Sequence, residues 1–296
     1  MIELDYFVVD VFTDAALMGN PLAVVMNSCG LTTEQMQAIA REFNLSETSF
    51  IERRTAEIEE SEGVRVRIFT TQEELIFAGH PTLGTASVIK LRTPETVREA
   101  AVTLALNVGA VPVYFAGETG SLYGEMRQHD PVFGAELEPV EVARLTGLSL
   151  NDLDPSLPPQ IVSTGTAFAI VALRSSDALT RLDVRRQEAM TWLRARGARW
   201  FYVLGPTGID APRYRARMQF HGGEDPATGS AAGCAIAYLV QHGAVASGER
   251  IQVRQGVEIN RQSELFLSAR KETEKITDVR VGGGTVLVAS GRLFLP

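Results

Sequence analysis

The chain has 296 residues and a net charge of −8, with 45% hydrophobic and 22% charged residues. This composition is that of a globular protein with a real core, and the acidic balance argues against nucleic acid or an anionic membrane as a partner. Acids stand where a signal peptide needs cations, and no apolar run approaches the ~18 residues of a membrane span. The two cysteines, Cys29 and Cys234, form no metal-type or disulfide pattern, so we expect a cytoplasmic protein without membrane segments.

The first half of the chain predicts strands with two helices between them. Alternating apolar and acidic residues indicate a strand over 3–12. Turn-forming residues indicate a loop over 13–21, and the continuous apolar run that follows indicates a buried strand over 22–26. A helix is expected over 34–43, capped by Thr33, and a strand begins near Glu47. A strand over 64–69 leads towards a helix over 85–91. Three further strands are expected at 102–106, 111–115 and 121–127.

The second half repeats this order after a junction over 128–139. Helices are expected over 141–148 and 186–196, with a loop over 151–159 and strands over 167–173 and 200–204. Thr164 and Gly165 stand where Asn20 stands in the first half, just before a buried strand. The arginines at 213, 215 and 217 alternate as on the solvent face of a strand. After a helix near 235–240 we expect strands at 251–254, 265–269 and 285–289, the last preceded by a turn at Gly282-Gly283-Gly284.

One segment occurs in both halves. His80-Pro81-Thr82-Leu83-Gly84-Thr85-Ala86 aligns without a gap with Asp225-Pro226-Ala227-Thr228-Gly229-Ser230-Ala231, at an offset of 145 residues. Pro suits the first turn of a helix, and a carboxylate ahead of it can cap free N–H groups. We therefore expect one central helix start in each half. Strands outnumber helices and do not alternate with them strictly, which favours an α+β duplication over a doubly wound fold.

Several common chemistries lack support in the sequence. Gly79 and Gly84 have the spacing of a phosphate-binding loop, but Thr85 follows where that loop needs Lys. No dinucleotide motif follows a strand, and the four histidines are scattered without metal-ligand spacing. Ser230 lies outside any G-x-S-x-G elbow. We expect no cofactor and no metal.

The repeated helix start suggests how the chain binds a ligand. A helix N-terminus offers unpaired N–H groups and about half a positive charge, so two such ends facing across a cleft would hold one carboxylate-bearing substrate. Glycines would let the substrate approach the backbone. Proton transfer beside a carboxylate also needs an acid and a base. Asp225 and His80 occupy matching positions, and Glu47 is the third candidate, although alone it reads as a solvated loop carboxylate.

At these residues the chain resembles the PhzF-like family of phenazine biosynthesis, which is related in fold to diaminopimelate epimerase. The resemblance runs the whole length and rests on four motifs in order: Asp10-Val11-Phe12 with Gly19-Asn20-Pro21-Leu22-Ala23-Val24, Ser46-Glu47-Thr48-x-Phe50, Ala78-Gly79-His80-Pro81-Thr82-Leu83-Gly84, and Glu224-Asp225-Pro226-Ala227-Thr228-Gly229-Ser230. It implies a homodimer of two-domain chains. Each domain is a mixed β-sheet or barrel wrapped around a central helix, and the two are pseudo-symmetric with the active site between them. The expected domains are residues 1–128, joined by the terminal strand 285–296, and residues 129–284.

The resemblance also implies cofactor-independent isomerisation of a small anionic carboxylate by proton transfer. The family's catalytic carboxylate falls on Glu47, with His80 and Asp225 as further catalytic residues. The expected substrate-binding residues are Asn20, Gly79, Gly84, Thr85, Thr164, Gly165, Gly229 and Ser230. The epimerase relatives use two cysteines, which the positions of Cys29 and Cys234 do not suit. The segment Phe220-His221-Gly222-Gly223 is shorter than in many family members, a departure that bears on the pocket.

Two other functions stay open at this point. One is an amino-acid epimerase or racemase with Glu47 and Asp225 as opposed bases. The other is a metabolite-binding module without catalysis.

Overall fold

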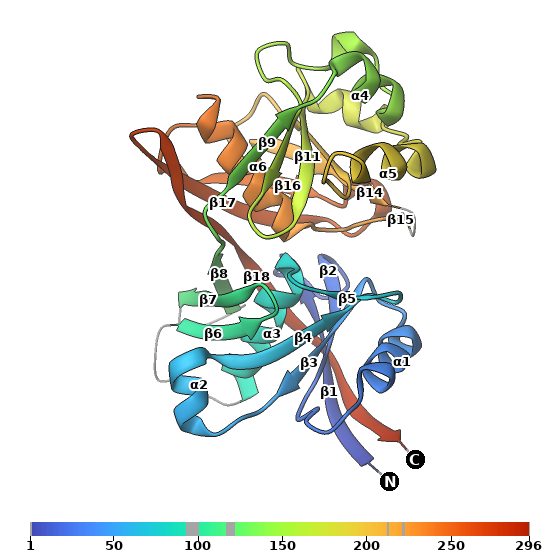
Figure 1. Cartoon of the computed structure of the whole chain (residues 1–296), viewed down its shortest axis with the longest axis vertical. Helices are drawn as coiled ribbons and strands as arrows, with labels where there is room; N and C mark the ends of the chain where they lie inside the picture. Colours follow the sequence, from blue (N-terminus) through green and yellow to red (C-terminus); the bar gives the residue numbers. More distant parts are fainter. Residues whose placement is uncertain (1, 93–100, 117–121, 212, 221–222, 296) are drawn as a thin grey trace. The chain divides into compact units, whose positions relative to one another are not determined.

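The computed structural model describes residues 2–92, 101–116, 122–211, 213–220 and 223–295. The chain divides into two compact units (Figure 1). Unit 1 comprises Met1–Arg127 and Gly282–Pro296, and unit 2 comprises Gln128–Val281. The boundaries expected from the sequence lie one and three residues further along the chain. Within the described ranges, no helix is both long and apolar enough to cross a membrane.

Unit 1 is a closed barrel of eight strands. The strands pair in the order β1, β2, β3, β4, β6, β7, β8 and β18, and β18 pairs back with β1. The pairs β2–β3 and β4–β6 are parallel, which makes the barrel mixed. The strands are β1 (Ile2–Val11), β2 (Asn20–Val25), β3 (Glu47–Glu52), β4 (Val64–Phe69), β6 (Ala101–Leu106), β7 (Gly109–Ala116), β8 (Leu122–Arg127) and β18 (Lys275–Leu295), with the short β5 (Glu74–Leu75) beside β4.

The helix α3 (Gly79–Arg92) fills this barrel. Every residue from Gly79 to Ile89 is buried. At Gly84 an added Cβ would lie 2.7 Å from side-chain carbons of both Leu22 and Val11, so only glycine lets the helix lie this close to β1 and β2. The hydroxyl of Ser87 bonds to that of Thr285 on β18 at 3.1 Å. A buried helix inside a barrel fixes the position of whatever its first turn carries.

The other two helices of unit 1 are α1 (Thr33–Phe43) and α2 (Ala56–Glu62). Helix α1 buries Met36, Ile39 and Ala40 in a core cluster with Phe50 and Phe69 of the barrel. Its cap is Thr32, one residue before the expected Thr33. The Thr32 hydroxyl accepts from the Gln35 N–H, and the Gln35 side chain accepts from the Thr32 N–H, which forms a capping box.

The expected turn at Gly282-Gly283-Gly284 is wrong, because β18 runs through all three glycines. An added Cβ would lie 2.3 Å from the Tyr123 hydroxyl at Gly282, and 2.3 Å from a carboxylate oxygen of Asp14 at Gly284. These glycines therefore allow close approach of neighbouring groups to a strand, a second use of glycine in strands besides bends.

Unit 2 is a mixed sheet in the order β17, β16, β13, β12, β11, β10, β9. Its central helix, α6 (Gly229–Gln241), is buried from Gly229 to Val240. A second core cluster joins the sheet to α4 and α5, with Leu145, Leu193 and Phe201 among its members. The elements are β9 (Val132–Glu136), β10 (Gln160–Ser163), β11 (Ala167–Ala172), β12 (Phe201–Pro206), β13 (Tyr214–Arg217), β14 (Gln219–Phe220), β15 (Gly223–Glu224), β16 (Ile251–Gln255) and β17 (Ser263–Glu272), with the helices α4 (Pro139–Thr146) and α5 (Arg186–Arg194) and the 3₁₀ turns η1 (Leu150–Asp152), η2 (Ser176–Arg181) and η3 (Val257–Ile259).

The two units share their connectivity. In unit 1 the parallel pair β2–β3 flanks α1, and the parallel pair β4–β6 flanks α3 in sequence. In unit 2 the parallel pair β11–β12 flanks α5, and the parallel pair β13–β16 flanks α6. The fold is the expected α+β duplication, with a sheet or barrel wrapped around a central helix in each unit.

Candidate active site

Three expected residues meet in unit 1, where β2, β3 and α3 bring them together. We call Asn20, Glu47 and His80 the Glu47 cluster. Asn20 is the first residue of β2, Glu47 the first of β3, and His80 the second of α3. The Glu47 side chain is only 16% exposed, so its interpretation as a solvated loop carboxylate is wrong. Parallel pairing sets Glu47 opposite Leu22, two residues along β2 from Asn20. Residues on the same face of a strand repeat every second position, so Asn20 and Leu22 point to the same side.

The side chains of this cluster lie within contact distance. The Nδ2 atom of Asn20 is 3.1 Å from Nδ1 of His80, and Nε2 of His80 is 3.4 Å from Oε2 of Glu47. The second distance is longer than an ordinary hydrogen bond, but catalytic contacts are often long before a substrate is bound. The cluster thus places one carboxylate beside one imidazole.

The imidazole of His80 is neutral. Burial lowers its pKa to about 3, because the charged ring loses its hydration, while a backbone hydrogen bond with Pro21 works in the opposite direction. The ring is 3% exposed. The contact with Glu47 is therefore between a neutral ring and a carboxyl group, and His80 serves better as a hydrogen-bond donor than as a charged partner.

The two copies of the repeated segment begin their helices at different places. Helix α3 begins at Gly79, six residues before the expected Thr85, whereas α6 begins at Gly229. Pro81 falls in the first turn of α3, where no N–H partner is lost. Gly84 lies inside α3, and packing against Leu22 and Val11 explains it. A helix thus begins at each copy of the repeated segment, as expected, but the two starts are not at matching positions of the alignment. Gly79 does start a helix, and the buried Thr85 hydroxyl has no hydrogen-bond partner among the described residues.

Asp225 belongs to a second group of buried polar residues, in unit 2. The hydroxyl of Thr228 donates to Oδ2 of Asp225 at 2.7 Å, and Nε2 of Gln255 donates to the Asp225 carbonyl at 2.8 Å. Gln255 also donates to the Thr228 hydroxyl at 2.9 Å and accepts from the Thr228 N–H at 3.1 Å. Asp225 does not cap α6, whose N-cap residue is Thr228. The carboxylate is instead held in a fixed position next to the helix start.

The remaining expected residues of unit 2 surround the first turn of α6. Nε2 of Gln128 donates to the Gly229 carbonyl at 2.9 Å, and the Thr164 hydroxyl donates to Oε1 of Gln128 at 2.6 Å. Gly165 has a φ of +138°, a conformation that favours glycine. Ser230 is the second residue of α6 and is 6% exposed. The structure thus brings Thr164 and Gly229 together through a residue that the sequence did not suggest.

Gln128 and Gln255 are buried residues that sequence reasoning missed. Each bonds to backbone of the Asp225–Gly229 segment from a distant part of the chain. A glutamine carries no motif of its own, but Gly233 offered a signal, since an added Cβ there would lie 1.9 Å from Oε1 of Gln128. Close approach of another group is one reason for a glycine inside a helix.

Cys234 is a neutral thiol in α6. Burial raises its pKa to about 11, while hydrogen bonds with Thr164 partly oppose the shift. A thiolate is the nucleophilic and basic form of cysteine, so this thiol is a poor base near neutral pH. Cys29 is exposed and donates to the Arg53 carbonyl at 3.1 Å. In the described residues, no three His, Cys, Asp or Glu side chains gather in a metal-binding group.

Glu224, next to Asp225, is engaged in a buried ion pair. Arg217 donates to it through Nε at 2.8 Å and Nη2 at 2.5 Å, and the side chains are 9% and 7% exposed. The expected solvent face of the strand at 213–217 is therefore wrong at Arg217. Of the segment Phe220-His221-Gly222-Gly223 expected to reshape the pocket, His221 and Gly222 lie outside the described residues.

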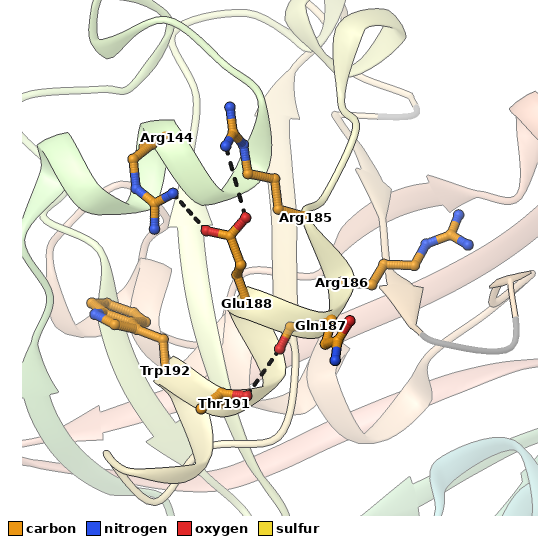
Figure 2. Close-up of a pocket in the computed structure, with 7 residues that line it drawn as sticks. All are labelled: Arg144, Arg185, Arg186, Gln187, Glu188, Thr191 and Trp192. Atoms are coloured by element: carbon orange, nitrogen blue, oxygen red, sulfur yellow. Dashed lines mark hydrogen bonds and ion pairs between the residues drawn. The ribbon is translucent and has the colours of Figure 1, made fainter.

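One surface pocket of unit 2 contains none of the residues of these two clusters. It has a volume of about 720 Å³ and is lined by residues of α4 and α5 and by Arg185, which precedes α5; none of them is expected in the site (Figure 2). Glu188 lies in its centre and pairs with Arg144 at 2.7 Å and Arg185 at 3.8 Å. Two of the three arginines that line this pocket are therefore paired with Glu188.

Comparison with known proteins places the chain among isomerases. The model of the family described as phenazine biosynthesis-like protein matches residues 9–291. A protein of Pseudomonas chlororaphis named trans-2,3-dihydro-3-hydroxyanthranilate isomerase is 33% identical over 98% of this chain and 99% of its own length. A solved PhzF-family structure from Bacillus anthracis superposes with a TM-score of 0.85 at 28% identity, covering 100% of both chains. A solved predicted epimerase from Pseudomonas aeruginosa gives 0.84 at 33% identity, covering 99% of this chain and 100% of that one.

The duplicated α+β fold and the relatives named isomerases, which match over nearly their full length, identify the chain as an isomerase. The chain belongs to the phenazine biosynthesis-like family, known as PhzF.

Proposed function

We propose that this protein is a cofactor-independent isomerase that moves a proton on a small carboxylate-bearing substrate, with Glu47 as the group that takes and returns the proton. The observation that carries the proposal is the position of Glu47, a largely buried carboxylate whose Oε2 lies 3.4 Å from Nε2 of the neutral His80. A buried carboxyl group beside a hydrogen-bond donor can act as base in one step and as acid in the next.

The remaining expected residues have supporting roles in this proposal. His80 donates a hydrogen bond to charge that develops on the carboxyl group or the substrate. Asp225 and Ser230 act in the same reaction, because their segment repeats that of His80 in sequence. Asp225 has the fixed geometry that substrate binding requires, since Thr228 and Gln255 hold it through hydrogen bonds of 2.7 to 2.8 Å.

The relatives suggest the first compound to test. We take trans-2,3-dihydro-3-hydroxyanthranilate, the carboxylate in the name of the Pseudomonas chlororaphis relative, as the test substrate. A thermal-shift screen of small carboxylates supplies further candidates for exchange analysis. Hits that gain solvent deuterium at carbon identify substrates of an enzyme. Hits that bind without exchange would indicate a metabolite-binding module instead.

The decisive experiment compares Glu47→Gln with the intact protein. The amide keeps the shape of the side chain but cannot take a proton, so turnover should be lost while the thermal shift with ligand remains. Turnover equal to that of the intact protein would exclude Glu47 as the proton carrier. Glu52→Gln is the matched control, because Glu52 lies on the same strand with 25% exposure and pairs with Arg65.

Three further parts of the proposal have simple tests. Independence from cofactors and metals predicts that dialysis against chelators leaves turnover unchanged. The poor basicity of the Cys234 thiol predicts the same for thiol alkylation. A homodimer of this chain, as the family resemblance implies, should sediment at twice the chain mass, and fractionation of the source cells should place it in the cytoplasm.

An amino-acid epimerase is the second candidate, suggested by the solved relative that is named a predicted epimerase. It predicts inversion at one carbon, with deuterium appearing at that carbon. An isomerase predicts a product with its hydrogen on a different carbon. Product analysis by NMR therefore separates the two.

A further inference from the structure

The end of strand β16 holds the segment that carries Asp225. Gln255, the last residue of β16, is 0% exposed. Its Oε1 accepts from the Thr228 N–H at 3.1 Å, and its Nε2 donates to the Asp225 carbonyl at 2.8 Å and to the Thr228 hydroxyl at 2.9 Å. Gly256 follows with a φ of +77°, and an added Cβ there would lie 2.7 Å from the Pro226 carbonyl oxygen. Two consecutive residues of β16 are therefore fitted to this segment.

The hydrogen bonds of Gln255 can run in one direction only. A backbone N–H donates and a backbone carbonyl accepts, so the two backbone contacts fix which end of the Gln255 amide is the oxygen. The amide nitrogen carries two hydrogens. One is donated to the Asp225 carbonyl, and the other to the Thr228 hydroxyl oxygen. The Thr228 hydroxyl is therefore an acceptor towards Gln255, and its own hydrogen points elsewhere.

That hydrogen is donated to Asp225. The Thr228 hydroxyl oxygen lies 2.7 Å from Oδ2 of Asp225. The reverse arrangement would need Asp225 to be a carboxylic acid that donates to Thr228. Gln255 and Asp225 are the only hydrogen-bond partners of the Thr228 side chain in the part of the chain that the structure describes, so the hydroxyl hydrogen would then have no acceptor. Thr228 is only 6% exposed, and a buried donor without an acceptor is unfavourable.

Charged and titratable groups stand on the elements around Asp225: Tyr202 of β12, Arg217 of β13, Glu224 of β15, Cys234 of α6 and Glu258 of η3. Tyr202 and Cys234 are neutral near neutral pH, because burial raises the pKa of both side chains. Arg217 is paired with Glu224 at 2.5 Å and with Glu258 at 3.8 Å. Arg217 is thus paired within this group, whereas Thr228 gives Asp225 a hydrogen-bond donor that carries no charge.

We propose that Thr228, itself held by Gln255, is a positioning residue that keeps Asp225 as a carboxylate facing the substrate as a hydrogen-bond acceptor. This inference rests on the proposed function, in which Asp225 takes part in the same reaction as Glu47. A hydrogen bond donated to a carboxylate stabilises the charged form over the acid. The backbone N–H of Asp225 also donates to the Met218 carbonyl at 2.9 Å, so the residue is held on both sides.

The consequence separates the two candidate reactions. An epimerase with two opposed bases needs one of them as an acid while the other acts as the base. Asp225 held as a carboxylate cannot be that acid. It accepts an N–H or O–H group of the substrate instead, and Glu47 alone takes and returns the proton.

Thr228→Val removes the donor with little change of shape, and Thr228→Ser keeps a hydroxyl at the same place. Without the donor, the Asp225 carboxylate should take up a proton at a pH that is higher by about one unit or more. Thr146→Val is the matched control. The Thr146 hydroxyl is also buried in unit 2 but donates to the Val142 carbonyl at 2.7 Å, so its loss should leave the titration of Asp225 unchanged.

The test is ¹³C NMR of protein labelled at the side-chain carboxyl carbon of aspartate, with the Asp225 signal assigned by its loss in Asp225→Asn. The chemical shift of this carbon reports whether the carboxyl group is protonated. We expect a carboxylate at neutral pH in the intact protein, with the same titration in Thr228→Ser and Thr146→Val and a shifted one in Thr228→Val. A carboxylic acid at neutral pH in the intact protein would overturn the inference, and this result requires no variant to fold. Equal titration in Thr228→Val and Thr146→Val would overturn it as well.

A second measurement follows turnover against pH. The kcat/KM of Thr228→Val, divided by that of the intact protein, should fall from alkaline to mildly acidic pH as Asp225 becomes protonated. The same ratio should stay constant for Thr228→Ser and Thr146→Val. A purely structural role of Thr228 would lower the ratio equally at every pH, and that result would refute the inference. Failure of the Glu47→Gln test would leave the titration of Asp225 untouched, so the inference and the proposed function can fail separately.

Discussion

The buried ion pair between Arg217 and Glu224 offers a sharp test of how unit 2 is held together. Arg217→Met keeps the length and the apolar stem of the side chain but removes its charge. The Glu224 carboxylate would then stay buried, with the 3.3 Å contact from Nε2 of Gln219 remaining. The same change also removes the 2.5 Å bond from Nη1 of Arg217 to the Leu179 carbonyl.

The expected loss follows from the burial of the pair. Breaking one partner of a buried pair typically lowers the free energy of unfolding by about 3–5 kcal/mol, because a buried charge is left uncompensated. Arg144→Met is the matched control. Arg144 also binds a glutamate through two nitrogens, Glu141 at 2.9 and 2.7 Å, but these side chains are 42% and 33% exposed. An exposed pair contributes only about 0–1 kcal/mol.

Urea unfolding followed by tryptophan fluorescence measures this difference. Both tryptophans of the chain, Trp192 and Trp200, belong to unit 2, so the signal reports the unit that contains the ion pair. The double variant Arg217→Met/Glu224→Leu should recover part of the loss, since it leaves no buried charge behind. A loss from Arg217→Met no larger than that from Arg144→Met would refute the reasoning from burial.

Three other predictions concern stability. Gly84→Ala should lower the free energy of unfolding by about 1–3 kcal/mol, because the new methyl group would lie 2.7 Å from Leu22 and Val11, and calorimetry that finds it neutral would contradict this packing. Gln255→Leu should lower the free energy of unfolding by about 2 kcal/mol or more, because it leaves the Thr228 N–H and the Asp225 carbonyl without their partner. The control Gln252→Leu loses only a partly exposed contact with Glu264 and should lower it by less than about 1 kcal/mol. The pKa of His80 is about 3 in the folded protein, below its value of about 6.5 in the unfolded chain. The unfolded chain therefore binds the proton more tightly, and the contribution of His80 should lower the free energy of unfolding by about 2 kcal/mol from pH 7 to pH 5. Unfolding curves of His80→Gln should lack that part of the pH dependence, and an unchanged slope would show that His80 is not its source.

Much of the fold follows from local patterns in the sequence. Alternation predicted β1, a continuous apolar run predicted β2, and the repeated segment predicted one central helix in each half. The start of α3 was misplaced because Pro81 and the residues before it read as a loop, whereas burial inside the barrel extends the helix back to Gly79. The glycines of β18 read as a turn because their neighbours across the sheet, Tyr123 and Asp14, are distant in sequence.

Sequence motifs likewise predicted some residues of the candidate site and missed others. Motifs selected Glu47, His80 and Asn20, and the structure brings their side chains together. Gln128 and Gln255 escaped notice because their role depends on hydrogen bonds to backbone about 30 to 100 residues away. Arg217 was assigned to the surface because a period of two indicates alternating faces but does not tell which face is buried.

The central claim is that Glu47 carries the proton. The most direct measurement incubates the test substrate with each protein in deuterium oxide and follows both isomerisation and deuterium at carbon by NMR. The intact protein and Glu52→Gln should isomerise the substrate and exchange hydrogen at the reacting carbons, while Glu47→Gln should bind it and do neither. Isomerisation or exchange by Glu47→Gln at the rate of the intact protein would contradict the account.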